Sequence, residues 1–250
     1  MGPEVFSVTP RVWCVRRPSY LACSYLVRAS NGIVLIDAGM DSEGRDVEVA
    51  LERAFGAGLA DVRAVLLTHW HNDHAAGARA VQERGAKVYY HAGDEAPLTR
   101  ASARRGVRGW MAGHVPELGP LVLFKGLLGE AAPRAVAADR LIHDGETLEG
   151  EFEVIETPGH TPGHVSFFYA PERVLFAGDA LAAIDGQVRF MSSVVTPDRE
   201  AARRSMVRCL ERAIDHVCPG HRMPLSADAR ARCTEMLDRL RAGAPWPLLG

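Results

Sequence analysis

The feature that most constrains this chain is a cluster of metal-binding residue types at residues 68–74, which read Thr-His-Trp-His-Asn-Asp-His. Three imidazoles and one carboxylate lie within six residues there. The cluster begins where an apolar, strand-like run ends, and loops at strand ends commonly present reactive groups. So dense a set of ligand types indicates a metal site.

The spacing of these residues favours two ions over one. His69 and His71 are two residues apart, so an extended backbone points both rings to the same side. Asp73 and His74 follow at the predicted start of a helix, where the chain turns toward a second point. Four adjacent ligands would overcrowd one ion, so we expect two ions about 3.5–4 Å apart that share one water. Imidazole and carboxylate groups bind zinc, iron or manganese.

Around the cluster, the apolar pattern predicts alternating strands and helices. The expected strands are 22–29 and 32–38, which form a hairpin, and 62–68, 86–91, 152–157, 165–169, 173–177 and 214–218. The expected helices are 43–55, 74–84, 198–213 and 226–241. Strands in two batches, each followed by helices, predict an α/β protein with two packed sheets and helices outside. We expect a single domain over residues 1–250, with an inserted helical or irregular segment at about 92–140.

The motif THWHNDH resembles the signature of the metallo-β-lactamase superfamily. Three later motifs agree with that family in order and spacing over about residues 20–225. They are TPGHTPGH at 157–164, VLFAGDAL at 174–181 and VCPGH at 217–221. The resemblance implies the metallo-β-lactamase fold, an αββα sandwich in which two mixed sheets are flanked by helices.

The resemblance also implies seven ligands for two divalent ions. They are His69, His71 and His160 for the first ion, Asp73, His74 and His221 for the second, and Asp179 as a bridge. A hydroxide shared by the ions is then the expected nucleophile. Asp73 is the expected catalytic residue, because it can orient that hydroxide and carry a proton to the leaving group. Zinc is the expected metal, with iron or manganese as alternatives.

Other residues have expected supporting roles. Asp37 ends the apolar run IVLIDAG, and it is expected to orient a ligand histidine because a buried carboxylate needs a partner. His164 is expected to be a packing histidine. Arg104, Arg105 and His114, in the inserted segment, are candidate substrate contacts if that segment closes over an anionic acyl compound. The same segment could instead be a solvated helix face packed on the domain or on a second subunit.

The full ligand set is similar to glyoxalase II (hydroxyacylglutathione hydrolase) and to acyl-homoserine lactonases, which predicts hydrolysis of a thioester, ester or lactone. β-Lactam hydrolysis is disfavoured, because true zinc β-lactamases typically replace the bridging aspartate. The 29 residues after His221 are short for the basic extension that binds glutathione, and Ala182 stands where many lactonases have tyrosine. Three alternatives stay open: a mononuclear iron persulfide dioxygenase, a phosphodiesterase or nuclease, and a non-catalytic metal-binding protein.

Composition narrows the expected partners. The net charge of −2, from 29 basic and 31 acidic residues, gives no electrostatic reason to expect nucleic acid. The five scattered cysteines, with no C-x-x-C pair, favour buried reduced thiols and a cytoplasmic protein. Neither a signal-peptide pattern nor an apolar run long enough to span a bilayer is present in the sequence. We expect a small-molecule substrate and no membrane partner, and the apolar stretch LVLFKGLLG makes a homodimer conceivable.

Overall fold

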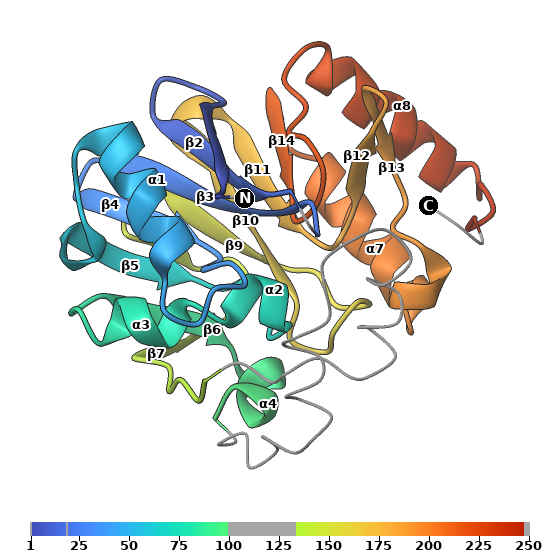
Figure 1. Cartoon of the computed structure of the whole chain (residues 1–250). Coiled ribbons are helices and arrows are strands. Elements are labelled where there is room, and N and C mark those ends of the chain that lie inside the picture. Colours follow the sequence, from blue (N-terminus) through green and yellow to red (C-terminus); the bar gives the residue numbers. More distant parts are fainter. Residues whose placement is uncertain (1, 19, 100–133, 248–250) are drawn as a thin grey trace.

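The computed structural model describes residues 2–18, 20–99 and 134–247. Two β-sheets pack face to face, and helices cover their outer faces (Figure 1). This arrangement confirms the predicted αββα sandwich. Residues 100–133 of the expected inserted segment lie outside the described residues. At its described ends, residues 92–99 form the 3-10 turn Ala92–Asp94 and the helix Glu95–Thr99, and residues 134–139 form neither helix nor strand.

The first sheet has seven strands in sequence order. They are β1 (Glu4–Ser7), β2 (Val12–Arg17), β3 (Ala22–Ala29), β4 (Gly32–Ile36), β5 (Val62–Leu66), β6 (Lys87–His91) and β7 (Arg140–Ile142). The pairs from β1 to β4 are antiparallel, and those from β4 to β7 are parallel. Parallel neighbours need long crossovers. Helices in these connections are α1 (Arg45–Phe55), α2 (Asn72–Ala75), α3 (Ala78–Gln82) and α4 (Glu95–Thr99), with the 3-10 turns η1 (Leu59–Asp61) and η2 (Ala92–Asp94).

The second sheet has five strands in the order β14-β11-β10-β9-β8. They are β8 (Thr147–Leu148), β9 (Phe152–Glu156), β10 (Val165–Tyr169), β11 (Val174–Gly178) and β14 (His216–Pro219). Its outer face is covered by α7 (Arg199–Leu210) and α8 (Ala229–Arg241) (Figure 1). A separate hairpin joins β12 (Ala182–Ile184) to β13 (Gln187–Arg189), and the remaining 3-10 turns are η3 (Ala170–Glu172) and η4 (Ser193–Val195). Strands of three residues are too short for an apolar period, so the sequence does not predict this hairpin.

Three buried apolar layers hold the sandwich together. Tyr25 and Phe167 belong to the layer between the sheets. Leu51 of α1 packs in the layer against the first sheet, and Met206 and Met236 of α7 and α8 pack in the layer against the second. Strands such as β5 and β11 are buried on both faces, which explains their continuous apolar sequences. All five cysteines are buried and free, as expected.

The predicted helix 74–84 is wrong in detail, because the structure has two short helices there, α2 and α3. Gly77 lies at the break between them. A Cβ atom added to it would lie 2.3 Å from the carbonyl oxygen of Ala38, so only glycine permits this close approach. The break therefore lets the chain pack tightly on the loop after β4.

No helix in the described ranges is long and apolar enough to cross a membrane.

The layer between the sheets yields a first prediction. Phe167 is fully buried and lies opposite Phe176 and Val154 on its neighbouring strands. The change Phe167→Ala should lower the free energy of unfolding by about 3–5 kcal/mol, because it removes a large buried side chain and leaves a cavity. Urea denaturation measures the change. Val49→Ala, at a side chain of α1 that is 38% exposed, is the control and should stay within about 0.5 kcal/mol of wild type. Equal losses in the two variants would contradict this account of the core.

Candidate metal centre

The histidines and aspartates of the predicted site lie at one edge of the sandwich. In the first sheet β4, β5 and β6 are parallel, so they end at the same edge. In the second sheet β9, β11 and β14 share one direction, because β9 and β11 are both antiparallel to β10 and β14 is parallel to β11. The loops after these strands carry Asp37 (after β4), residues 69–74 (after β5), His160 (after β9), Asp179 (after β11) and His221 (after β14).

The first group of potential ligands consists of His69, His71 and His160, whose ligand atoms lie within 4.8 Å of one another. Nε2 of His160 is 2.9 Å from Nδ1 of His71. The ring of His69 meets the other two edge-on, with centroid distances of 4.8 Å to His71 and 4.7 Å to His160. The structure therefore joins two histidines from the loop after β5 to one from the other sheet.

The second group consists of Asp73, His74 and His221. Nε2 of His221 is 3.4 Å from Nε2 of His74 and 3.3 Å from Oδ2 of Asp73. Nε2 of His74 is 3.7 Å from the same Asp73 oxygen. This group also combines both sheets, since His221 follows β14.

Asp179 lies between the two groups. Its Oδ2 is 3.3 Å from Nε2 of His160 and 3.5 Å from Nε2 of His221. Its Oδ1 is 3.7 Å from Nε2 of His74. One carboxylate thus faces members of both groups, which is the place that a bridging ligand would take. The structure brings together all seven residues that the family resemblance implied.

The geometry of these atoms fits bound metal. Zinc binds histidine nitrogen at about 2.0–2.1 Å with tetrahedral angles, which separates two ligand nitrogens by about 3.3 Å. The distances above, from 2.9 to 3.7 Å, bracket that value. Moreover, Nε2 of His69 and Oδ1 of Asp179 are buried with no hydrogen-bond partner in the described part of the chain. A buried polar atom without a partner is costly, and a metal ion would supply one to each.

Asp37 aligns two of the ligand rings from behind. Its Oδ2 accepts a hydrogen bond from Nδ1 of His74 at 2.9 Å and one from Oγ1 of Thr68 at 2.8 Å. The Thr68 hydroxyl in turn lies 3.0 Å from Nδ1 of His69, so it accepts from that ring while donating to Asp37. Both rings therefore carry their proton on Nδ1 and turn Nε2 toward the site. Asp37 thus contacts a ligand-type histidine, as the sequence predicts.

Backbone carbonyls align two further rings. Nδ1 of His160 donates to the carbonyl of Val195 at 2.5 Å, and Nδ1 of His221 donates to the carbonyl of Tyr20 at 3.2 Å. Each ring is left with Nε2 facing the cluster. His71 differs, because its Nδ1 is the atom that faces the cluster.

His164 lies outside the two groups of potential ligands. Beyond the packing role that the sequence predicts, it makes specific hydrogen bonds. Its Nε2 accepts a hydrogen bond from the backbone N–H of Asp179 at 2.9 Å, and its Nδ1 is 2.7 Å from Oγ1 of Thr157. Burial, followed by the nearby His160, lowers the pKa of His164 to about 3, so the ring stays neutral and can accept. A Cβ on Gly178 would lie 2.7 Å from this ring, which explains why glycine precedes Asp179. His164 therefore positions the backbone of the central carboxylate.

The two groups differ in proton affinity when no metal is bound. Burial, and then His160, lower the pKa of His71 to about 4, and burial also holds the pKa of His69 well below its usual value. Burial alone would lower the pKa of His74 too, but three neighbouring carboxylates, with Asp73 and Asp179 foremost, raise it to about 10. Burial is likewise outweighed at His221, whose pKa is raised to about 9 chiefly by Asp179. At neutral pH His74 and His221 therefore hold protons on both ring nitrogens, whereas His69 and His71 do not.

Asp94 is a residue that the sequence analysis missed. This carboxylate is 1% exposed, and it accepts hydrogen bonds from the backbone N–H of Trp70 at 3.1 Å, from Oγ1 of Thr161 at 2.7 Å and from the backbone N–H of Gly163 at 2.8 Å. It ties the loop after β5 to the loop after β9. The available signal was an aspartate just after the apolar run KVYYH, the same pattern that drew attention to Asp37.

A further group of potential ligands, His91, His143 and Glu156, shares no residue with the two groups above. His91 already uses both ring nitrogens, since Nδ1 accepts from the N–H of Gly93 at 3.1 Å and Nε2 donates to Oε1 of Glu156 at 3.1 Å. These bonds give His91 a structural role.

Three predicted substrate contacts, Arg104, Arg105 and His114, lie outside the described residues.

The contacts of Asp94 yield a second prediction. Asp94→Ala leaves three donors without their acceptor, so unfolding free energy should fall by about 2–4 kcal/mol and zinc affinity by about 10–100-fold. Urea denaturation and competition with a zinc chelator measure the two effects. Glu95→Ala changes an exposed neighbouring carboxylate and serves as control. If the loss of zinc affinity is no greater in Asp94→Ala than in the control, Asp94 does not position the ligand loops.

The raised pKa values yield a third prediction. At pH 7 the metal-free protein holds protons on His74 and His221, whose pKa values are about 10 and 9, and these protons compete with metal. As pH rises toward those values the competition fades, so apparent zinc affinity should increase by up to about tenfold per pH unit for each proton released. Chelator competition between pH 6.5 and 8.5 measures the slope. An affinity independent of pH over that range would show that these rings are already neutral.

Comparison with known proteins identifies the family of the chain. A model of the metallo-β-lactamase superfamily matches residues 22–221. YflN, a probable metallo-hydrolase of Bacillus subtilis, is 29% identical over 233 residues, which cover 84% of this chain and 83% of that protein. A hydroxyacylglutathione hydrolase of Serratia proteamaculans is 32% identical over 123 residues, or 47% of this chain and 33% of that protein. The match thus spans only a third of that enzyme's length.

Solved structures agree on the fold. A metallo-β-lactamase family protein from Thermus thermophilus superposes with a TM-score of 0.66 at 24% sequence identity, over 94% of this chain and 81% of that one. At this identity the likeness shows the fold alone. The family match, by contrast, covers most of the chain and spans all the ligand-type residues described above. The chain therefore belongs to the metallo-β-lactamase superfamily, a superfamily of metal-dependent hydrolases.

Proposed function

We propose that the protein is a binuclear metal-dependent hydrolase, with zinc as the metal, that cleaves a thioester, ester or lactone. The observation that carries this proposal is the contact of the Asp179 carboxylate with both histidine groups. A single-ion site would need only one of these groups. Asp73, His74 and His221 supply a second set of ligand atoms, which supports a second ion.

A cavity of about 400 Å³ opens directly on the cluster. Its lining combines five ligand-type residues with three apolar ones: His71, Asp73, His160, Asp179 and His221, together with Val194, Val195 and Pro197. A volume in this range suits a small molecule. The side chain of Val194 is 77% exposed, so the apolar wall is available to a substrate.

When bound, two divalent ions supply an activated water and polarise the substrate carbonyl. In the hydrolysis, the water oxygen bonds to the carbonyl carbon and the C–S or C–O bond breaks. One proton of the water goes to the leaving thiol or alcohol, and the products are that group and a carboxylic acid. Asp73 lines the cavity and is only 8% exposed, so it can orient the water and hold the transferred proton.

The relatives support a thioester, ester or lactone as the substrate. The Serratia relative is a hydroxyacylglutathione hydrolase, an enzyme that acts on an acyl compound of glutathione. Three residues support the same chemistry in this chain. Asp37 holds the ring of His74, His164 holds the backbone of Asp179, and Asp94 holds the loops that carry the ligand-type residues. Because these side chains are already held in place, the site does not have to rearrange when charge develops during the reaction.

Elemental analysis of the purified protein, followed by a screen of thioesters, lactones and phosphodiesters, tests this proposal. We expect about two ions per chain and hydrolysis of an acyl substrate. Asp179→Asn should lower kcat/KM by at least about 100-fold and reduce the metal content, because it removes the shared negative charge. Asp185→Asn, at an exposed turn position, is the matched control. One iron per chain that added metal cannot double would overturn the two-ion proposal, and oxygen uptake with persulfides would then be measured.

A further inference from the structure

A second cavity, of about 240 Å³, adjoins the metal centre at His221. Three segments far apart in the sequence form it: the turn at Tyr20 and Leu21, the residues from 182 to 192 around the β12–β13 hairpin, and the residues directly after β14. His221 also lines the cavity at the cluster. The two cavities therefore share a wall at a residue that faces Asp179.

Apolar side chains dominate this second cavity. Leu21, Ala182, Ile184, Phe190 and Met191 all line it. Ligand pockets of about 300–1,000 Å³ hold drug-sized molecules, so a volume of about 240 Å³ suits a shorter apolar chain. Ala182, where many lactonases have tyrosine, lines the cavity with a small side chain.

Arg222 lies at the rim, directly after His221, in a backbone conformation that favours glycine. Its φ of +76° is in the left-handed region. Its N–H donates to the carbonyl of Leu21 at 2.7 Å, and its carbonyl accepts from Sγ of Cys23 at 3.2 Å. An isolated β-bridge to Ala183 also holds the backbone of Arg222. The fold thus holds an arginine at a position where glycine would be relaxed.

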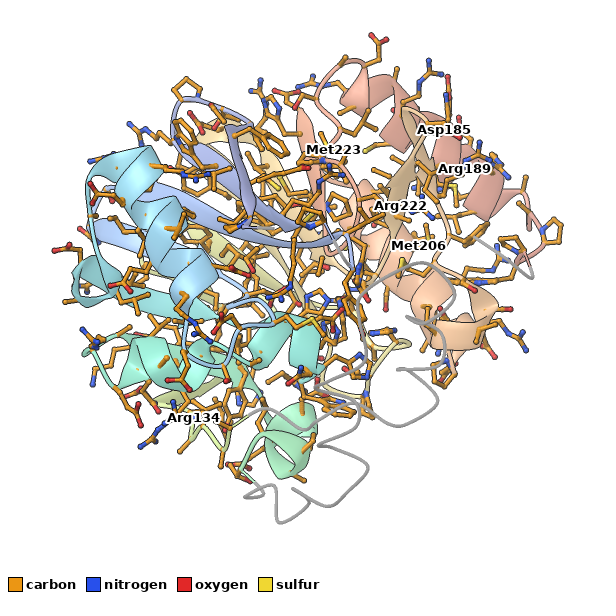
Figure 2. All side chains as sticks on the ribbon, viewed as in Figure 1. Arg134, Asp185, Arg189, Met206, Arg222 and Met223 are labelled. Atoms are coloured by element: carbon orange, nitrogen blue, oxygen red, sulfur yellow. The ribbon has the colours of Figure 1, made fainter. Side chains whose placement is uncertain are left out.

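The guanidinium of Arg222 has no ion-pair partner within residues 2–18, 20–99 and 134–247. The side chain is exposed, and Figure 2 shows it on the same side of the molecule as Asp185 and Arg189 of the β12–β13 hairpin. A positive charge without a counter-charge at the rim of an apolar cavity is suited to an anionic group on a ligand.

We propose that this second cavity is the acyl subsite, and that it takes a short apolar acyl chain whose anionic end pairs with Arg222. The inference rests on the proposed function, since the carbonyl of such a chain must lie at the metal centre. It names the substrate class: an ester or thioester of an acid that carries a second acidic group. The apolar wall selects chain length, and Arg222 selects charge.

The test uses the zinc-loaded protein and three esters: 4-nitrophenyl acetate, 4-nitrophenyl octanoate and the mono-4-nitrophenyl ester of suberic acid. The last two match in chain length and differ by one terminal carboxylate. We expect kcat/KM to rise at least about 30-fold from the acetate to the octanoate, because each buried methylene favours binding about threefold to fourfold. The suberate ester should exceed the octanoate by about 3–10-fold, the effect of one charged pair at a rim.

Arg222→Gly separates charge from folding, because glycine relaxes the left-handed backbone while it removes the guanidinium. Its melting temperature should equal or exceed that of wild type, whereas its ratio of kcat/KM for suberate and octanoate esters should fall to about one. Arg222→Lys keeps the charge and should retain a ratio above one. Ile184→Trp narrows the cavity and should reduce the preference for eight-carbon chains over acetate about tenfold. Arg84→Gly, an exposed arginine outside both cavities, is the control.

The outcomes distinguish the two proposals. Hydrolysis of none of the three esters, together with none of the thioesters and lactones of the screen, overturns the proposed function and this inference with it. The inference alone is overturned if the esters are hydrolysed but the kcat/KM ratios do not change. These are the octanoate-to-acetate and suberate-to-octanoate ratios, compared among wild type, Arg222→Gly and Ile184→Trp. The proposed hydrolase function then stands.

Discussion

The site depends on one buried carboxylate, Asp179, placed where two groups of histidines from opposite sheets meet. Burial opposes its charge, and the surrounding imidazoles, His221 first, reverse that effect and hold its pKa well below the usual range. One of its oxygens has no hydrogen-bond partner in the described ranges. Such an arrangement is costly without positive charge between the groups, which is why the geometry points to metal.

Around that carboxylate, hydrogen bonds from behind hold the rings of His69, His74, His160 and His221. Asp37, the Val195 carbonyl and the Tyr20 carbonyl each accept a ring proton. Asp94 and His164 act instead on backbone N–H groups of the ligand loops. These contacts fix tautomer and direction, and a preorganised site does not reorganise during reaction.

The metal centre and its neighbouring cavity use different parts of the same framework. Ligand-type residues come from loops at the ends of strands in both sheets, which are rigid because the strands are buried on both faces. The second cavity is bounded by the short β12–β13 hairpin and by Arg222, outside the two main sheets. The proposed chemistry and the proposed selectivity therefore depend on different parts of the framework.

The sequence predicts those features whose residues lie close together along the chain. The cluster at 69–74 and the buried strands are contained in short windows, so spacing and apolar pattern predict them. His160, Asp179 and His221 were assigned through a family resemblance, because nothing in their own windows joins them to residues 69–74. Asp94, the role of His164 and the cavity beside Arg222 were decided only by the tertiary structure. Their partners lie tens to hundreds of residues away, and hydrogen bonds across such separations exist only once the sheets have packed and their strand ends share one edge.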